Sequence, residues 1–221
     1  MLGYWAIDIF SDVKNEYNED EFILITNKSL CTLDFIKTIK PDVIFFYGWS
    51  WYVTKDITDN YMCMCLHPSS LPKYRGGSPI QNQIMNDEFE SAVTIFKMGA
   101  GLDDGPIYFQ QTFELTGYLD EILQKIENLG IYGTKLFIKD YKKNIYRFRK
   151  QDETEATSFK RLKPSDSEIK PDDFLNHDAK YFYNKIRGLQ KPYPECYIKC
   201  KTGKIIFKNI EYDNTSDITP L

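Results

Sequence analysis

One of only two histidines in the chain lies in the segment CMCLHPSSLPKYRGGSP, residues 63–79. An imidazole changes its charge near neutral pH, so His67 could act as a general base, bind a metal, or be a buried residue satisfied by a backbone group. Two prolines and two glycines after it predict a rigid loop that lets a ligand approach the backbone. The loop leads into a helix with Ser78 as N-cap and Pro79 as first residue, where free N–H groups favour an anion or an oxyanion.

A metal site is the first alternative for this histidine. Cys63, Cys65 and His67 alternate along a predicted strand and therefore share one face. Cys196 and Cys200 could complete a ligand set. Neither C-x-C nor C-x-x-x-C has the two-residue gap that is usual in structural zinc sites. We therefore predict that no metal is bound.

A second glycine-rich turn, GLDDGP (residues 101–106), follows another predicted strand and carries Asp103 and Asp104. In a parallel sheet, the loops beyond the carboxyl ends of the strands border one crevice. A carboxylate from this turn can therefore meet His67, hold the tautomer of the imidazole and stabilise its charged form. These are the requirements of a general base.

Alternating strand and helix patterns must position these loops. Helices are predicted over 29–40, 79–85, 119–143 and 178–189, and buried strands over 22–27, 42–48, 61–67, 91–98 and 107–116. This order favours an α/β, Rossmann-like fold with a mostly parallel sheet and helices on both faces. A small C-terminal unit has one helix and a β-hairpin that turns at Thr202–Gly203. We expect a catalytic domain at 1–149, a linker at 150–177 and the C-terminal unit at 178–221.

Composition narrows the possible partners and compartment. The 221 residues are 42% hydrophobic and 27% charged, which is typical of a globular protein, and the net charge is −4. We expect neither a nucleic-acid partner nor a membrane partner, since no apolar run approaches the ~18 residues of a membrane span. Five cysteines and the lack of a basic leader favour the cytoplasm. The hairpin presents an open edge, so a homodimer is expected.

The segments HPSSLPKYRGGSPIQ and SAVTIFKMGAGLDDGPI together resemble the formyltransferases that use N10-formyltetrahydrofolate. That family includes the methionyl-tRNA enzyme and the nucleotide-sugar N-formyltransferases. Of these two groups, the sequence resembles the nucleotide-sugar enzymes more. The resemblance extends into the C-terminal part of the chain through the segments RLKPSDSEI and IRGLQKPYP. The resemblance implies that His67 is the catalytic base and Asp103 its partner, with N10-formyltetrahydrofolate as cosubstrate. It also places candidate cosubstrate contacts at Trp49, Ser50, Trp51 and Asp104, although Asp104 could be only a turn residue.

The chain departs from the family pattern in two places. The family has an asparagine two residues before the histidine, where this chain has Cys65, and a thiol is a poor hydrogen-bond donor. Asn82 is the nearest amide that could replace it as a catalytic donor; otherwise it is an ordinary helix residue. The family also opens with a central strand, whereas MLGYWAIDIF predicts the turn and helix that should follow it. The pattern therefore predicts that the first strand is missing or shortened.

The amine that accepts the formyl group is the remaining question. An enzyme that acts on tRNA would need a basic surface and a further C-terminal domain, and the sequence shows neither. An enzyme that acts on glycinamide ribonucleotide would need a glycine-rich phosphate loop after the first strand, and none is visible. The sequence fits a nucleotide-linked amino sugar better, for example dTDP-4-amino-4,6-dideoxyglucose. Alternatives are a methionyl-tRNA-type enzyme and a weakly active or inactive module that binds a nucleotide sugar or folate. Candidate contacts to the acceptor are Tyr74, Arg75, Gly76, Gly77, Arg161, Lys163, Arg187 and Tyr193.

Overall fold

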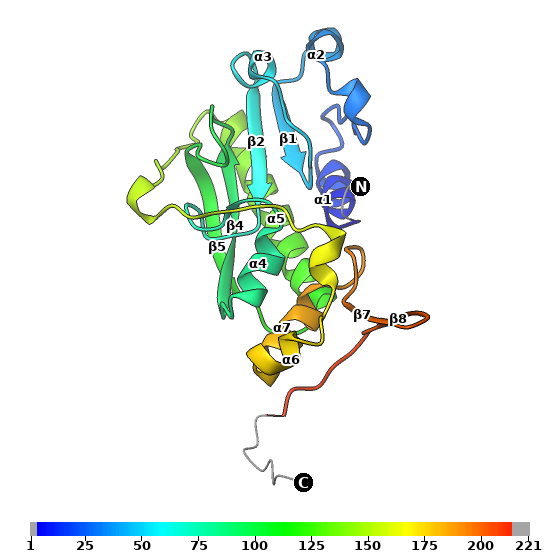
Figure 1. Ribbon diagram of the computed structural model, residues 1–221. Helices are drawn as coiled ribbons and strands as arrows, with labels where there is room; N and C mark the ends of the chain where they lie inside the picture. The colour runs from blue at the N-terminus through cyan, green and yellow to red at the C-terminus, as the bar shows by residue number, and fades with distance from the viewer. Residues whose placement is uncertain (1–3, 214–221) are drawn as a thin grey trace.

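The computed structural model describes residues 4–213. Its centre is a four-stranded sheet in the order β1-β2-β4-β5 (Figure 1). The strands are β1 (Val43–Tyr47), β2 (Met62–His67), β4 (Glu90–Lys97) and β5 (Ile107–Glu114). Four of the five predicted strands therefore form, each close to its predicted bounds.

One part of this sheet is parallel and the other is antiparallel. β1 and β2 are parallel, with Tyr47 beside Leu66, whereas β2–β4 and β4–β5 are antiparallel. Parallel strands need a long crossover, which α3 (Lys55–Thr58) and its flanking loops provide between β1 and β2. The loop at 98–106 is short and joins β4 to β5 as a hairpin. The α/β class is confirmed, while the direction of β4 and β5 differs from the parallel arrangement that we predicted for them.

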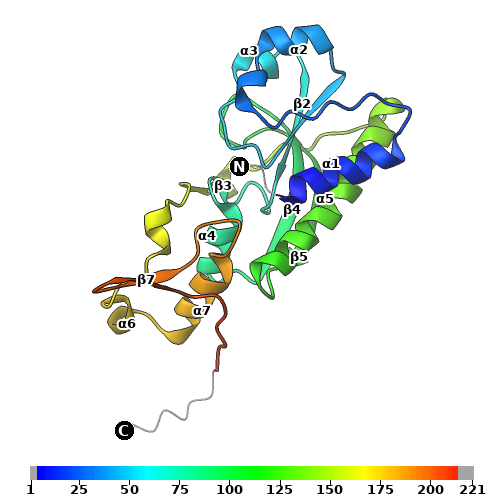
Figure 2. The ribbon, with the colours of Figure 1, turned by 90° about the vertical axis from the view of Figure 1, so that its right-hand side faces the viewer.

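Helices cover both faces of the sheet (Figure 2). On one face, α1 (Tyr4–Glu16) packs against α5 (Leu119–Lys142), and on the other lie α2 (Leu33–Ile39) and α3. Alternate residues of β1 serve the two cores, since Tyr47 belongs to the first and Phe46 to the second. The buried helix residues of the first core include Ile9, Val13, Ile122, Ile126 and Phe137, and those of the second are Ile36 and Ile57. Burial on both faces explains why β1 and β2 are apolar along most of their length.

The remaining predicted elements are also present. α4 (Pro79–Met85) begins after Ser78, although the Ser78 hydroxyl accepts the N–H of Leu162 and does not cap its own helix. The C-terminal unit contains α7 (Ala179–Gly188) and a hairpin of β7 (Tyr197–Cys200) and β8 (Gly203–Ile206). The helix and hairpin of this unit are therefore confirmed.

The strand predicted at 22–27 does not form. Residues 21–27 have no regular structure, and a short 3₁₀ helix follows at Lys28–Leu30. Ile23 and Leu24 are each 45% exposed. An apolar run becomes a strand only when a neighbour completes its hydrogen bonds, and an apolar cavity lies between this segment and β1. The strand prediction was wrong for that reason.

The predicted linker is held at several points. β6 (Ser158–Phe159) pairs in parallel with β3 (Arg75–Gly76), and Glu168 forms a bridge with Tyr197 of β7. The same segment contains two 3₁₀ helices, Glu153–Glu155 and Pro164–Ser167, and the short α6 (Asp173–Asn176). The domain bounds stay a prediction. Within residues 4–213, no helix has the length and apolarity needed to cross a membrane.

Candidate active site

His67 is the last residue of β2 and only 6% exposed. Its Nε2 lies 2.8 Å from the carbonyl oxygen of Tyr74. Tyr74 has a φ of 60°, so the loop bends sharply and turns this carbonyl back toward the strand end. A carbonyl oxygen only accepts hydrogen bonds, so Nε2 carries the hydrogen and donates it. The loop backbone therefore fixes the tautomer of the imidazole.

Asp103 faces the other ring nitrogen. Its Oδ2 lies 3.5 Å from Nδ1 of His67 and accepts the N–H of Gly76 at 2.8 Å. The loop that carries Asp103 passes close to β4: a Cβ on Gly105 would lie 1.7 Å from the carbonyl oxygen of Lys97, so only glycine fits there. The structure thus brings His67 and Asp103 together.

This geometry divides the two roles that we had given to Asp103. The carbonyl of Tyr74, and not the carboxylate, selects the neutral tautomer with hydrogen on Nε2. Nδ1 is then free to take a proton, and the positive ring that results faces the negative charge of Asp103. Asp103 can therefore stabilise the charged form of His67 without setting its tautomer.

Cys65 lies two residues before His67 on the same face of β2, in the position where the family asparagine is expected. Burial, with a smaller contribution from the Asp103 carboxylate, raises the pKa of its thiol well above the usual value. The thiol stays protonated and makes only a weak 3.8 Å contact with the carbonyl of Leu66. It is thus a poor donor at the place where an oxyanion would need one.

Asn82 uses its amide elsewhere. Its Nδ2 donates to the carbonyls of Gly77 (2.9 Å) and Ser78 (3.0 Å) at the start of α4. These bonds satisfy carbonyls of the loop that leads into the helix. They favour a structural role for Asn82, and its catalytic role stays a prediction.

A buried network that the sequence did not indicate supports the Asp103 loop. The Nε2 of Gln151 donates to the carbonyls of Asp103 and Gly105, both at 2.8 Å. Its Oε1 accepts two hydrogen bonds from Arg75, whose guanidinium also pairs with Glu153 at 2.7 Å. Gln151 lies in a polar stretch, and no local pattern marks it as different from its neighbours.

The contacts of Arg75 leave its side chain buried in that network, so it is not free to hold a phosphate. Arg187 is also buried: it donates to Asn184 and to the carbonyls of Leu115 and Gly117. Burial lowers the pKa of this guanidinium. Of the predicted acceptor contacts, these two arginines therefore stabilise the fold.

Tyr74, Gly76 and Gly77 shape the first loop. The Tyr74 ring stacks on Phe159 at 4.6 Å, and its hydroxyl donates to Glu88 at 2.6 Å. A Cβ on Gly77 would lie 2.4 Å from the Cα of Arg161. The loop and the segment after β6 thus touch through their backbones.

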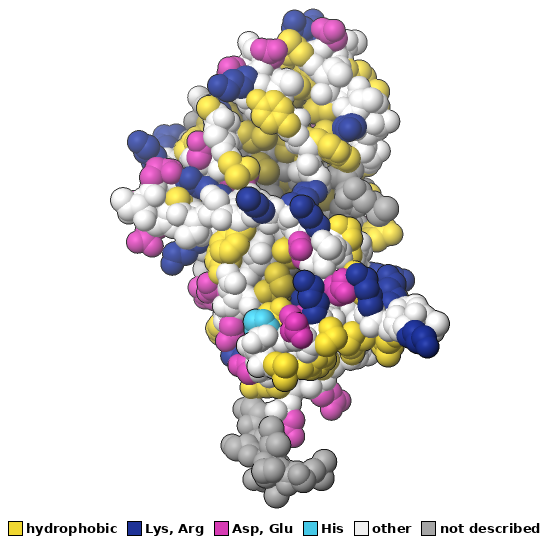
Figure 3. All heavy atoms as spheres, viewed as in Figure 1, with side chains coloured by type: hydrophobic (Ala, Val, Ile, Leu, Met, Phe, Trp, Pro, Cys, Tyr) yellow, Lys and Arg dark blue, Asp and Glu magenta, His cyan; other side chains and the backbone are white. Residues whose placement is uncertain are grey.

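The other three predicted acceptor contacts are accessible. Arg161 and Lys163 are exposed and Tyr193 is 37% exposed. Tyr193 lines a groove of about 1010 Å³ together with Trp5, Pro164 and Ser165. Burial raises the pKa of Tyr193, and a hydrogen bond with Gln81 and, to a smaller extent, the charge of Arg161 partly oppose this. Figure 3 shows several basic side chains across the middle of one face of the molecule.

The aromatic loop after β1 lies at the same edge of the sheet as His67, because β1 and β2 are parallel and in register. Trp49 and Trp51 meet edge to face at 4.8 Å, and Trp49 also contacts Phe46. Asp104 braces its own turn by accepting the N–H of Gly101 at 3.2 Å. Contacts of Trp49, Ser50, Trp51 and Asp104 with a cosubstrate stay predictions. In residues 4–213, no group of three or more His, Cys, Asp or Glu side chains could hold a metal.

Comparison with known proteins identifies the family. The formyl transferase family model matches residues 25–128. The methionyl-tRNA formyltransferase of Finegoldia magna is 31% identical over 181 residues, which cover 80% of this chain and 57% of the relative. A structure of methionyl-tRNA formyltransferase from Clostridium thermocellum is 33% identical, with a TM-score of 0.82 over 96% of this chain and 91% of that one. The chain therefore belongs to the formyltransferase family. It spans about half the length of the curated relatives that it matches.

Two more distant structures share the fold. HypX from Aquifex aeolicus, in complex with tetrahydrofolic acid, has a TM-score of 0.77 at 16% identity, over 91% of this chain and 36% of that one. A sugar N-formyltransferase from Shewanella sp FDAARGOS_354 has a TM-score of 0.73 at 15% identity, over 94% of each chain. The family that the motifs resemble is confirmed, but the relatives near 30% identity carry the methionyl-tRNA name, not the nucleotide-sugar one.

Proposed function

We propose that this chain transfers a formyl group from N10-formyltetrahydrofolate to a primary amine. The observation that carries the proposal is the placement of His67 between the Tyr74 carbonyl and Asp103, at the end of β2. The amine forms a bond to the formyl carbon and Nδ1 accepts the proton that it loses, while Asp103 stabilises the imidazolium. The imidazolium then returns this proton to N10 as the bond from N10 to the formyl carbon breaks and tetrahydrofolate leaves. The folate supplies the formyl carbon.

The aromatic loop at residues 49–51 fits the cosubstrate side of the site. It lies at the carboxyl edge of β1, next to the strand that ends in His67. Trp49 and Trp51 give an apolar wall of the kind on which a flat heterocycle packs. The fold that the chain shares with a protein bound to tetrahydrofolic acid also supports this placement.

We propose a nucleotide-linked amino sugar as the acceptor, in the groove beside Tyr193. Arg161 and Lys163 are exposed cations just before the lining residues Pro164 and Ser165, suited to a diphosphate, and Tyr193 offers aromatic surface to a base or sugar. The net charge of −4 is consistent with a small anionic acceptor held by a few local cations.

Methionyl-tRNA is the second candidate acceptor. The identity of 31% to 33% to proteins of that name supports it.

The test is a panel of amines offered to the purified chain with N10-formyltetrahydrofolate. The panel contains nucleotide-linked 3-amino and 4-amino sugars and methionyl-tRNA, and products are identified by mass spectrometry. We expect one amino sugar to gain a formyl group with the wild type and none with His67→Asn. Formylation of methionyl-tRNA alone would establish the second candidate, and absence of any product would contradict formyl transfer.

A further inference from the structure

A groove of about 1010 Å³ lies beside Tyr193, and we call it the Tyr193 groove. Its lining comes from the N-terminal halves of α1 and α5, from residues 164–165 and 191–195, and from the hairpin of β7 and β8. These segments are far apart in the sequence, so the groove exists only in the folded chain.

The segment before residues 164–165 connects this groove to the catalytic loop. A Cβ on Gly77 would lie 2.4 Å from the Cα of Arg161. The neighbouring Gly76 donates its N–H to Asp103, which faces His67. A ligand held beside Arg161 would therefore lie against the loop that leads from His67.

The backbone on both sides of Tyr193 is fixed by hydrogen bonds. The N–H of Tyr193 donates to the carbonyl of Gln190 at 2.9 Å, and the hydroxyl of Ser167 donates to the carbonyl of Pro194 at 2.9 Å. The loop thus holds the tyrosine in place before any ligand binds, which lowers the entropy that binding costs.

The hydroxyl oxygen of Tyr193 accepts hydrogen bonds from two buried side chains, Gln81 of α4 and Trp5 of α1. Burial raises the pKa of this phenol, whereas the contacts with Gln81 and Trp5 lower it, which is the effect of N–H groups that stabilise a phenolate. Nε2 of Gln81 is buried and has no closer acceptor in the described part of the chain. An oxygen that already accepts from two donors has only its own hydrogen left to offer.

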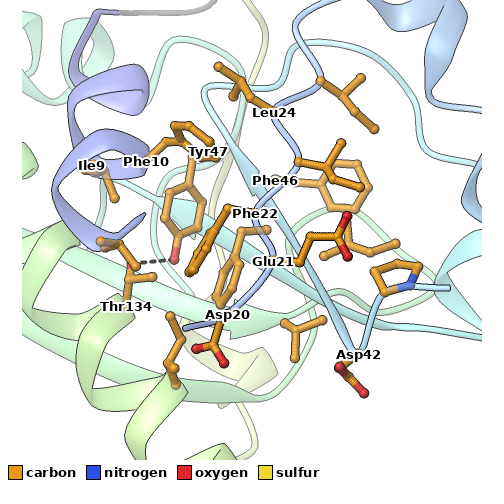
Figure 4. A pocket seen from close by; sticks show the side chains of 18 of the residues that line it. Ile9, Phe10, Asp20, Glu21, Phe22, Leu24, Asp42, Phe46, Tyr47 and Thr134 are labelled. Atoms are coloured by element: carbon orange, nitrogen blue, oxygen red, sulfur yellow. Dashed lines mark hydrogen bonds between the residues drawn. The ribbon is translucent and has the colours of Figure 1, made fainter. Parts of the chain in front are cut away.

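Tyr193 differs in this respect from other tyrosines of the chain. Tyr47 donates to Thr134 at 2.8 Å, a contact drawn as a dashed line in Figure 4, and Tyr108 donates to Asp140 at 2.8 Å. The hydroxyl of Tyr193 donates to no acceptor within residues 4–213, and its side chain is 37% exposed on the groove. Tyr193 therefore offers the groove a hydrogen-bond donor.

Arg161 indicates the charge of the acceptor atom that such a donor would meet. After burial and Gln81, the charge of Arg161 is the next influence on the pKa of Tyr193. Arg161 is exposed and forms no salt bridge in the part of the chain that the structure describes. An O–H donor together with an unpaired guanidinium favours an anionic oxygen, and a phosphate oxygen accepts hydrogen bonds from both.

Carboxylates also line the groove and limit where an anion can bind. Asp8 belongs to α1, and Asp120 and Glu127 belong to α5. Burial, and then the charge of Asp8, raises the pKa of Glu127, so negative charge is already concentrated along these helices. An anion is therefore favoured at the loops that carry Tyr193 and Arg161, and not along α1 and α5.

We propose that the hydroxyl of Tyr193 donates a hydrogen bond to a phosphate oxygen of the acceptor, and that Tyr193 thereby selects amines linked to a phosphate. This inference rests on the acceptor class proposed above. It assigns the polar end of the side chain to the phosphate, while the ring remains available to the sugar next to it.

The test is calorimetric titration of the full chain with inorganic pyrophosphate at constant ionic strength. Tyr193→Phe removes the hydroxyl and keeps the ring, and we expect it to raise Kd by about 10- to 100-fold, the usual effect of losing a hydrogen bond to a charged group. The matched control is Tyr197→Phe. Tyr197 lines the same groove, but its hydroxyl already contacts Glu168 at 3.5 Å, so Kd should stay at the wild-type value. Arg161→Gln, at an exposed position, should also raise Kd.

An unchanged Kd in Tyr193→Phe, an equal rise in Tyr193→Phe and Tyr197→Phe, or no binding of pyrophosphate to the wild type would overturn the inference. With a nucleotide-linked amino sugar as substrate, Tyr193→Phe should raise KM and leave kcat nearly unchanged, because the phosphate is bound equally before and during the reaction. Pyrophosphate binding that depends on Tyr193, without formyl transfer to any amine, would contradict the proposed function and leave this inference standing.

Discussion

A backbone carbonyl and a carboxylate approach His67 from opposite sides. The Tyr74 carbonyl holds hydrogen on Nε2, so the nitrogen that can take a proton is Nδ1, next to Asp103. In the proposed reaction, the substrate amine therefore approaches from the side of the Asp103 turn. The same turn accepts the N–H of Gly76 and so keeps both loops at a fixed separation.

His67→Asn should lower kcat for formyl transfer by ~10²–10⁴-fold, the usual effect of removing a general base. KM for either substrate should change little, because an asparagine amide can still donate to the Tyr74 carbonyl and keep the loop in place. Steady-state kinetics of tetrahydrofolate release with the best acceptor check this. Turnover close to that of the wild type would disprove the assignment of the base.

Cys65→Asn should raise kcat while leaving KM nearly unchanged. An added donor acts mainly on the developing oxyanion, and one such donor is worth ~10²–10³-fold in other enzymes. Cys65→Ser, which offers a hydroxyl of similar size, is the matched variant and should give a smaller rise. If both variants fold and neither is faster than the wild type, backbone N–H groups already supply the donor.

Among the connecting elements, the loop at 98–106 depends on contacts far along the chain. Gln151 holds two of its carbonyls and is itself held by Arg75 from the first loop. The network thus links the turn that carries Asp103 to the loop that begins at His67.

Gln151→Leu should lower the free energy of unfolding by ~1–3 kcal/mol, since it leaves buried carbonyls and part of Arg75 without partners. It should also slow transfer, because Asp103 is no longer held opposite Nδ1. Urea denaturation and kcat measure the two effects. The control is Glu153→Gln, which changes the exposed end of the same network. It should leave both the free energy of unfolding and kcat unaltered. An equal loss in the two variants would refute the argument that burial decides the effect.

The sequence was sufficient to predict the elements whose signals are local. His67 and Asp103 follow from two loops at strand ends, and α5 from a regular apolar stripe. What could not be predicted depends on distant partners. The run at 22–27 has no neighbouring strand to complete its backbone hydrogen bonds. Arg187 is buried against the carbonyls of residues 115 and 117, and Gln151 holds a loop that lies nearly fifty positions earlier in the chain. No local pattern contains that information.

For the molecule as a whole, tyrosine burial predicts a loss of stability in alkali. Burial, and then the contact with Glu88, raises the pKa of Tyr74 to about 12, and burial also raises the pKa of Tyr47 and Tyr108. A raised pKa means that folding favours the neutral phenol. The stabilisation is complete below the unfolded pKa of about 10 and is lost as pH rises through the folded pKa.

Urea midpoints should therefore be level from pH 8 to pH 9.5 and fall steadily above pH 10. Tyr74→Phe should show a shallower fall over pH 10 to 12, because it has no phenol to ionise at that site. Tyr52→Phe, at a tyrosine that is 82% exposed, is the control and should follow the wild type. A midpoint that does not change up to pH 11.5 would contradict the prediction.

The pairing of β6 with β3 has a consequence for how such a protein can diverge. Residues 158–161 lie against Gly76 and Gly77, so an insertion there would displace the loop that positions His67. The turn between β7 and β8 has no such neighbour, since a Cβ on Gly203 would meet nothing within 4 Å. Length variation among descendants of this chain should therefore accumulate at the hairpin. Under the proposed acceptor contact of Arg161, a change in acceptor preference should arise there by substitution, at constant length.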